Sequence, residues 1–100
     1  MGHVKIFWKS NCPKCPAAKN VGGILRQEGI KVKNYDLNTV GGLAEGAYYS
    51  VMATPTLIIE DEEENRIADF RGMVPTAKEV QKLIRNGAEI TSSSWRSDLG

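Results

Sequence analysis

Two cysteines separated by two residues, Cys12 and Cys15, stand between an apolar stretch and a helical pattern. Residues 4–8 are rich in β-branched and aromatic side chains and predict a buried strand, and the polar residues after them predict a short loop. Beyond the pair, apolar residues recur at helical spacing and Pro13 is tolerated in a first helical turn, so we expect a helix over about residues 13–28. Its apolar positions are Ala17, Ala18, Val21, Ile24 and Leu25. The cysteine pair is therefore expected at a strand-to-helix junction.

The spacing of the pair favours chemistry over stability. A disulfide that closes so short a loop removes little entropy from the unfolded chain, which leaves redox chemistry or metal binding. Cys12 is expected near the first helical turn, where unpaired backbone amides and the helix dipole favour a thiolate, and Lys9 and Lys14 add positive charge. Cys15 lies one helical turn further on, directed toward the protein. We therefore predict that Cys12 attacks a disulfide and that Cys15 resolves the mixed disulfide.

A cysteine pair can also bind a metal or simply pack in a core. A structural zinc site needs four ligands, and beyond the cysteines the chain offers one histidine, His3, so zinc within one chain is not expected. A metal or iron–sulfur centre shared between two copies stays an alternative. Passive core cysteines fit less well, because Pro13 and Lys14 between them favour an exposed turn.

The composition limits the size of the fold and the kind of partner. One hundred residues, 41% of them apolar and 25% charged, are enough for one domain with a modest core. The formal net charge of +1 provides no long-range field, so neither nucleic acid nor a membrane is expected as a partner. The first residues lack a charged region followed by an apolar one. We expect a soluble, cytoplasmic monomer.

Three more strands are expected. Residues 30–37 form the second. Its apolar residues change from even positions, Ile30 and Val32, to odd positions, Tyr35 and Leu37, which in a regular strand lie on opposite faces. We therefore predict a bulge or an edge strand. The apolar run 57–59 is typical of a strand covered on both faces. Residues 67–70 alternate as a returning strand, after an acidic turn at residues 60–64.

Two more helices complete the pattern. Asn38 and Thr39 can cap a short helix that carries Leu43, Ala44, Ala47, Tyr48 and Val51. Thr76 to Glu79 fits a capping box, and Asn86-Gly87 predicts the end of that last helix. From residue 88 the chain is mostly small and polar, so we expect a flexible tail over 88–100. The order strand, helix, strand, helix, strand, strand, helix predicts an α/β domain with a four-stranded mixed sheet flanked by helices.

Three segments resemble a known family. Residues 6–15 resemble the glutaredoxin active site, with a lysine three residues before the first cysteine and a proline directly after it. Thr54-Pro55 is similar to the cis-proline element of the thioredoxin superfamily, and residues 71–75 resemble the glycine-containing turn that enters the last helix. The resemblance covers residues 4–87 and implies a thioredoxin-like fold, β-α-β-α-β-β-α. We accordingly predict a domain over 1–87.

The resemblance also implies a site around the dithiol. Lys9, Pro13 and Lys14 are expected to support it, and Pro55 is expected to be cis and to lie against it, because the third strand begins where the first ends. The Thr54 backbone would then pair with a substrate chain. A basic rim of Lys9, Lys14, Lys19 and Arg71, with Gly72 beside it, would bind carboxylates of glutathione or of an acidic protein. For Lys19, a role in surface solubility is equally well supported.

The departures from the family favour one electron donor. Glutathione-dependent glutaredoxins usually follow the cis-proline strand with paired glycines and a polar-acidic segment, whereas this chain has Gly72-Met73-Val74-Pro75-Thr76. That Gly-x-x-Pro pattern is similar to the glutaredoxin-like hydrogen donors of ribonucleotide reductase, which thioredoxin reductase reduces. Typical thioredoxins carry a buried acidic residue and a tryptophan where this chain has Ile6 and Asn11, so we do not expect an ordinary thioredoxin.

These observations together imply a thiol-disulfide oxidoreductase. It would reduce protein disulfides without a bound cofactor or metal, with thioredoxin reductase or glutathione as the electron donor. A ribonucleotide reductase is the target that the resemblance implies. The alternatives are a glutathione-dependent glutaredoxin and a metal or iron–sulfur carrier on the same fold.

Overall fold

The structure is a computed structural model that describes residues 2–93, with side chains described up to residue 85. Four strands and three helices alternate in the predicted order. The strands are β1 (His3–Trp8), β2 (Lys31–Asp36), β3 (Thr56–Glu60) and β4 (Arg66–Arg71). The helices are α1 (Cys15–Gln27), α2 (Val40–Tyr48) and α3 (Ala77–Ser93). The predicted α/β fold is confirmed.

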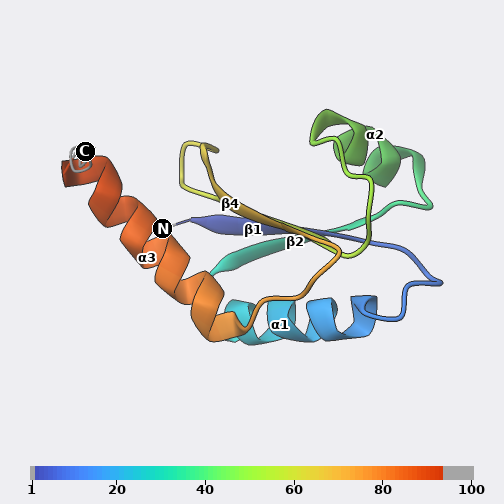
Figure 1. Ribbon diagram of the computed structural model, residues 1–100, viewed down its shortest axis with the longest axis horizontal. Coiled ribbons are helices and arrows are strands. Elements are labelled where there is room, and N and C mark those ends of the chain that lie inside the picture. The colour runs from blue at the N-terminus through green and yellow to red at the C-terminus, as the bar shows by residue number, and fades with distance from the viewer. Residues whose placement is uncertain (1, 94–100) are drawn as a thin grey trace.

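The four strands form one mixed sheet in the order β2-β1-β3-β4. β1 runs parallel to β2 and antiparallel to β3, and β3 pairs antiparallel with β4. The loop from β1 to α1, which carries the cysteines, therefore lies at one end of the sheet, and the acidic β3–β4 turn lies at the other (Figure 1). In that turn the Asp61 carboxylate accepts hydrogen bonds from the backbone N–H groups of Asn65 and Glu63, which lower the pKa of Asp61.

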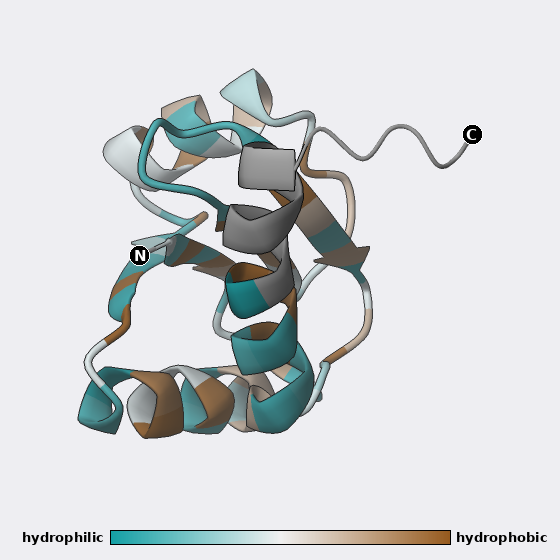
Figure 2. Cartoon of the chain, turned by 90° about the vertical axis from the view of Figure 1, so that its left-hand side faces the viewer, coloured by the Kyte–Doolittle hydropathy of each residue, from teal (hydrophilic) through white to brown (hydrophobic). Residues whose placement is uncertain are grey.

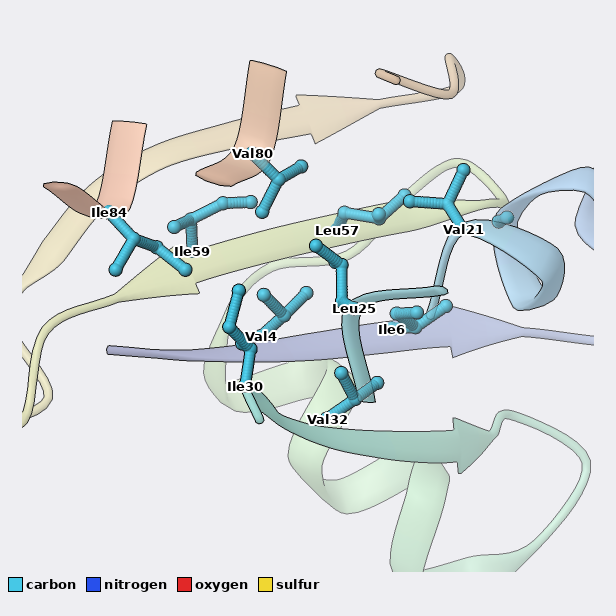
Figure 3. Close-up of a cluster of buried hydrophobic side chains, with 11 residues drawn as sticks. Val4, Ile6, Val21, Leu25, Ile30, Val32, Leu57, Ile59, Val80 and Ile84 are labelled. Carbon is cyan, nitrogen blue, oxygen red and sulfur yellow. The ribbon is translucent and has the colours of Figure 1, made fainter. Parts of the chain in front are cut away.

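Helices α1 and α3 cover one face of the sheet and bury the main core (Figure 1). The apolar stripes of both helices meet alternate residues of β1 and β3 (Figure 3). Hydrophobic and hydrophilic segments alternate along α1, as expected for a helix with one buried face (Figure 2). Gly22 is buried in this layer, and a Cβ there would lie 2.8 Å from Ile6 Cδ1, whereas Gly23 is exposed with no atom nearby. Gly22 thus allows α1 to lie close to the sheet.

Helix α2 covers the opposite face over a smaller core. Phe7 and Ile58 pack there with Tyr49, which follows α2 directly. The rings of Phe7 and Tyr35 stack with centroids 5.1 Å apart. Because β1 and β3 are covered on both faces, their central residues are buried on both parities.

The second strand is an edge strand with a continuous register to β1, so the predicted bulge is not needed. Ile30 and Val32 pack in the core with α1, and Tyr35 packs on the other face against Phe7. The change of parity in the sequence therefore reflects cover by different helices on the two faces.

Three helix boundaries differ from the prediction. Helix α2 ends at Tyr48, so Val51, which was expected on it, lies in the segment that follows. Helix α1 begins at Cys15 rather than near residue 13, because residues 12–15 form a turn in which the Cys15 N–H donates to the Cys12 carbonyl. The proline in the first helical turn is therefore Pro16, not Pro13. Helix α3 continues to Ser93 and so includes the first residues of the predicted tail. Gly87 weakens a helix without removing a hydrogen-bond donor, so it did not end this one. The rest of that tail, 94–100, lies outside the described residues.

The predicted caps are present at both later helices. The Thr39 hydroxyl accepts a hydrogen bond from the Gly42 N–H at 3.0 Å at the start of α2. At α3, the Thr76 hydroxyl accepts from the Glu79 N–H, and the Glu79 carboxylate accepts from the Thr76 N–H. This reciprocal pair confirms the capping box.

Candidate active site

The two cysteines form a disulfide at the start of α1. Their Cα atoms are 5.3 Å apart across the turn described above. Cys12 is 8% exposed and Cys15, the first residue of the helix, is 2% exposed. Cys12 is therefore the more exposed residue of the pair.

The turn between the cysteines is linked to the proline before β3. The Thr54–Pro55 peptide bond is cis, as predicted. The Gly72 N–H donates to the Pro55 carbonyl at 2.7 Å, and the Lys14 ammonium group reaches the Gly72 carbonyl at 3.5 Å. Gly72 has a φ of +75°, a backbone conformation that glycine adopts without a steric penalty. Three segments that are distant in the sequence are thus linked, and the Lys14 side chain joins the dithiol turn to the other two.

The backbone of Thr54 lies next to this junction. Thr54 is partly exposed, and within the described part of the chain its N–H and carbonyl groups form no hydrogen bond. The next residue after Pro55, Thr56, already belongs to β3 and pairs with Phe7 of β1. Thr54 therefore presents an unpaired backbone edge at the end of the sheet that carries the dithiol.

The residues of the predicted basic rim have different partners. Arg71 does return to this end of the sheet, paired with Thr56, but its guanidinium donates to the Asp69 carboxylate and to the carbonyls of Ser50 and Tyr49. Arg71 therefore links the segment after α2 to β4 through hydrogen bonds. Lys9 is exposed, and Lys14 makes the contact with Gly72 described above.

A pocket of about 120 Å³ lies on the α1 side of the disulfide. It is lined by Trp8, Lys9, Ser10, Cys12, Cys15, Pro16 and Lys19. The Lys19 ammonium group sits 3.4 Å from the centre of the Trp8 ring, a cation–π contact. Lys19 was expected on the rim, but its contact with Trp8 was not predicted from the sequence.

A buried polar cluster under α2 was not predicted either. The Lys5 ammonium group donates to the Tyr49 hydroxyl at 2.7 Å and to Glu45 at 3.2 Å, and it lies 3.6 Å from Glu60. The Tyr49 hydroxyl donates to Glu60 at 2.6 Å, and the His3 ring nitrogen Nε2 lies 2.7 Å from the other Glu60 oxygen. We call these five residues the Lys5 cluster.

The environment of the Lys5 cluster shifts two of its titrations. Burial acts to lower the pKa of Lys5, but its hydrogen bonds with Tyr49 and Glu45 and the charge of Glu60 outweigh burial, so the pKa is raised. Burial raises the pKa of Tyr49, and the hydrogen bond to Glu60 raises it further. Lys5 and Tyr49 therefore hold their protons more tightly in the folded protein.

One signal in the sequence could have pointed to this cluster. Lys5 lies between Val4 and Ile6 in a strand expected to be buried, and Glu60 ends the apolar run of another such strand. A charged residue in a strand covered on both faces needs a buried partner of opposite charge. Ile6, at the position where typical thioredoxins are acidic, is fully buried in the other core.

Within the residues described with side chains, no group of three or more His, Cys, Asp or Glu residues is arranged to hold a metal ion. None of the helices between residues 2 and 93 has the length and apolar composition needed to cross a membrane.

Comparison with known proteins assigns the family. The thioredoxin domain family matches residues 2–85. A probable thioredoxin of Archaeoglobus fulgidus is 35% identical over 83 residues, which are 82% of this chain and 85% of that protein. The chain belongs to the thioredoxin domain family. With its closely spaced cysteine pair, this member of the family is a thiol-disulfide oxidoreductase.

Solved structures of thioredoxins share the fold. Thioredoxin 1 from Thermosipho africanus superposes with a TM-score of 0.69 at 24% identity, over 91% of this chain and 99% of that one. A thioredoxin from Thermus thermophilus gives a TM-score of 0.68 at 18% identity, over 96% of this chain and 82% of that one. At these identities the likeness shows the fold alone. The family match over residues 2–85 is what confirms the expected membership of the thioredoxin superfamily.

Proposed function

We propose that the protein reduces disulfides of partner proteins, with Cys12 as the attacking sulfur and Cys15 as the resolving sulfur. The observation that carries the proposal is the junction of the dithiol turn, Gly72 and the Pro55 segment, beside the unpaired backbone of Thr54. An extended partner chain could pair with that backbone and bring its own disulfide to Cys12. Lys9, Pro13 and Lys14 would support the site from the dithiol side.

The reaction proceeds in two exchange steps. The Cys12 thiolate attacks one sulfur of the partner disulfide, forms a mixed disulfide and releases the other partner sulfur as a thiolate that takes up a proton. The Cys15 thiolate then attacks the Cys12 sulfur, forms the Cys12–Cys15 bond and releases the second partner sulfur. Two electrons pass from the protein to the partner. A reductase must supply two electrons to restore the dithiol.

We assign this electron supply to thioredoxin reductase rather than to glutathione. The segment Gly72-Met73-Val74-Pro75 lacks the paired glycines and the polar-acidic residues of glutathione-dependent glutaredoxins. Membership of the thioredoxin domain family agrees with this assignment. The Gly-x-x-Pro pattern of residues 72–75 supports a ribonucleotide reductase as one target of the protein. Reductive turnover also requires a compartment that keeps thiols reduced, such as the cytoplasm.

The electron donor can be identified by following the oxidation of NADPH. The oxidised protein is supplied with thioredoxin reductase alone, and separately with glutathione and glutathione reductase. We expect NADPH consumption with thioredoxin reductase. Turnover with the glutathione system alone would instead favour the glutaredoxin alternative, and turnover with neither system would contradict a reductive role.

A variant separates the two enzymatic routes independently. The Cys15→Ser protein keeps the attacking sulfur and lacks the resolving one. We expect it to lose activity on a glutathionylated peptide together with its activity on protein disulfides. Glutathionyl activity that survives in Cys15→Ser would show a route that uses Cys12 alone.

A further inference from the structure

The pocket on the α1 side of the disulfide includes neither Lys14 nor Gly72 in its lining. Its lining includes both cysteines, so a group bound there lies next to the reacting sulfurs. Its volume of about 120 Å³ suits the end of one side chain rather than a whole peptide. The pocket is thus placed to contact the partner residue that neighbours the attacked disulfide.

The polar residues that line this pocket are two lysines and a serine, beside the apolar surfaces of Trp8 and Pro16 and the two cysteines. Lys9 and Lys19 both line it, and none of the lining residues is acidic. The Ser10 hydroxyl accepts a hydrogen bond from the Asn38 side chain at 3.1 Å, which leaves its own O–H available to donate. The positive end of the α1 dipole lies at the same place, because Cys15 and Pro16 begin that helix.

The contact with Trp8 holds Lys19 in place without neutralising it. A ring face attracts an ammonium group through its quadrupole and carries no net charge, so the positive charge of Lys19 stays available to a ligand. Within the described part of the chain, neither Lys9 nor Lys19 forms an ion pair with a carboxylate. A lysine side chain that is already positioned loses less conformational entropy when it binds an anion.

We propose that this pocket, between Trp8 and the first turn of α1, is a subsite for a carboxylate of the disulfide partner, bound by Lys9 and Lys19. The proposal rests on the proposed function and names its substrate preference: disulfides that have an Asp or Glu side chain close to the attacked cysteine. Trp8 acts as a positioning residue, because it acts through Lys19. The subsite adds to the Thr54 edge, which contacts backbone and selects no side chain.

The preference can be measured without any reductase. The protein is reduced chemically, freed of reductant and mixed in single-turnover reactions with two peptides that share one intramolecular disulfide and differ by Glu or Gln beside a cysteine. The measured quantity is the ratio of the second-order rate constants for the Glu and Gln peptides. We expect a ratio of about three to five for the wild type at low ionic strength, falling as salt is added.

Variants test which residues set that ratio. Lys19→Gln should lower it to nearly one, and Lys19→Arg, which keeps the charge and can stack on Trp8, should keep most of it. Lys33→Gln is the matched control, because Lys33 is an exposed lysine on β2 outside the pocket and its loss changes the net charge equally. The Lys33→Gln ratio should equal that of the wild type.

The outcomes separate the subsite from the activity. Equal rates for the two peptides in the wild type would overturn the subsite alone, as would Lys19→Gln and Lys33→Gln proteins with the same ratio. Failure to reduce either peptide would overturn the proposed function and the subsite with it. A ratio that falls in Lys19→Gln and returns in Lys19→Arg supports the subsite.

Discussion

The two sulfur atoms of the dithiol differ in their surroundings. Cys15 is the first residue of α1 and is almost completely buried, whereas Cys12 lies in the preceding turn with more of its surface exposed. A partner sulfur must approach in line with the sulfur that it exchanges with, so access decides which cysteine forms the mixed disulfide. Substitution of one cysteine should therefore have a different chemical consequence from substitution of the other.

The Cys15→Ser variant should accumulate a covalent complex with a disulfide peptide, and the Cys12→Ser variant should not. In Cys15→Ser the mixed disulfide at Cys12 forms but lacks the sulfur that resolves it. Mass spectrometry of the intact protein after exposure to the peptide would detect the added mass. An adduct on Cys15 in the Cys12→Ser protein, formed at a comparable rate, would contradict the assigned roles.

Arg71 illustrates which single-residue contacts the sequence could not show. Its position in β4 correctly placed it at the end of the sheet near the dithiol. Its guanidinium donates hydrogen bonds to the carbonyls of Tyr49 and Ser50, which are free to accept them because α2 ends there. Side-chain partners that come from distant loops leave no local pattern in the sequence.

At the scale of elements, helix α2 lies very close to the end of β2. A Cβ atom at Gly42 would collide with the carbonyl oxygen of Asp36, whereas a Cβ at Gly41 would have no atom within 4 Å. The Gly42 N–H also donates to the capping Thr39 hydroxyl. Because the obstacle at Gly42 is backbone, it cannot turn aside as a flexible side chain would.

The Gly42→Ala variant should therefore lower the free energy of unfolding by about 2 kcal/mol, as an overpacked site does. The neighbouring Gly41→Ala is the matched control and should leave stability unchanged or raise it by up to about 1 kcal/mol, since alanine favours the helix. Urea unfolding of the oxidised proteins gives both values. Equal effects of the two substitutions would contradict the close approach of α2 to β2.

The elements themselves were largely predictable because their signals are local. The capping box at Thr76, the apolar run of β3 and the helical spacing of α1 each act within a few residues, and all three are present. The start of α1 was misplaced because a turn hydrogen bond at the cysteines, not the position of Pro13, sets it. The extent of α3 was underestimated because Gly87 lowers the helix propensity without removing a backbone donor, so it does not by itself end a helix.

At the scale of the whole molecule, the Lys5 cluster joins β1 and β3 of the sheet to the α2 segment. Lys5 binds Glu45 and Tyr49, which are 40 and 44 residues away in the sequence, so only the folded chain brings the three together. If one partner of a buried ion pair is removed, the other charge stays buried without a partner, which lowers the stability of the fold. The cluster therefore links the packing of α2 against the sheet to the pairing of β1 with β3.

The Lys5→Met variant should lower the free energy of unfolding by about 3 kcal/mol near pH 8, because Glu60 is then buried without its ammonium partner. The pKa of Lys5 is raised in the folded state, so its contribution is complete below the unfolded value of about 10.5 and is lost as the pH rises through the folded value. The stability curves of the wild type and Lys5→Met should therefore begin to approach each other above about pH 10.5.

Urea unfolding of the oxidised proteins between about pH 8 and pH 11.5 measures this convergence. The raised pKa of Tyr49 has the same sign and is retained in both proteins, so a shallower alkaline decline should remain in Lys5→Met. Lys33→Met removes an exposed lysine from the neighbouring strand and should run parallel to the wild type throughout. A constant gap between the wild type and Lys5→Met would mean that the lysine stabilises the fold through its apolar stem rather than through its charge.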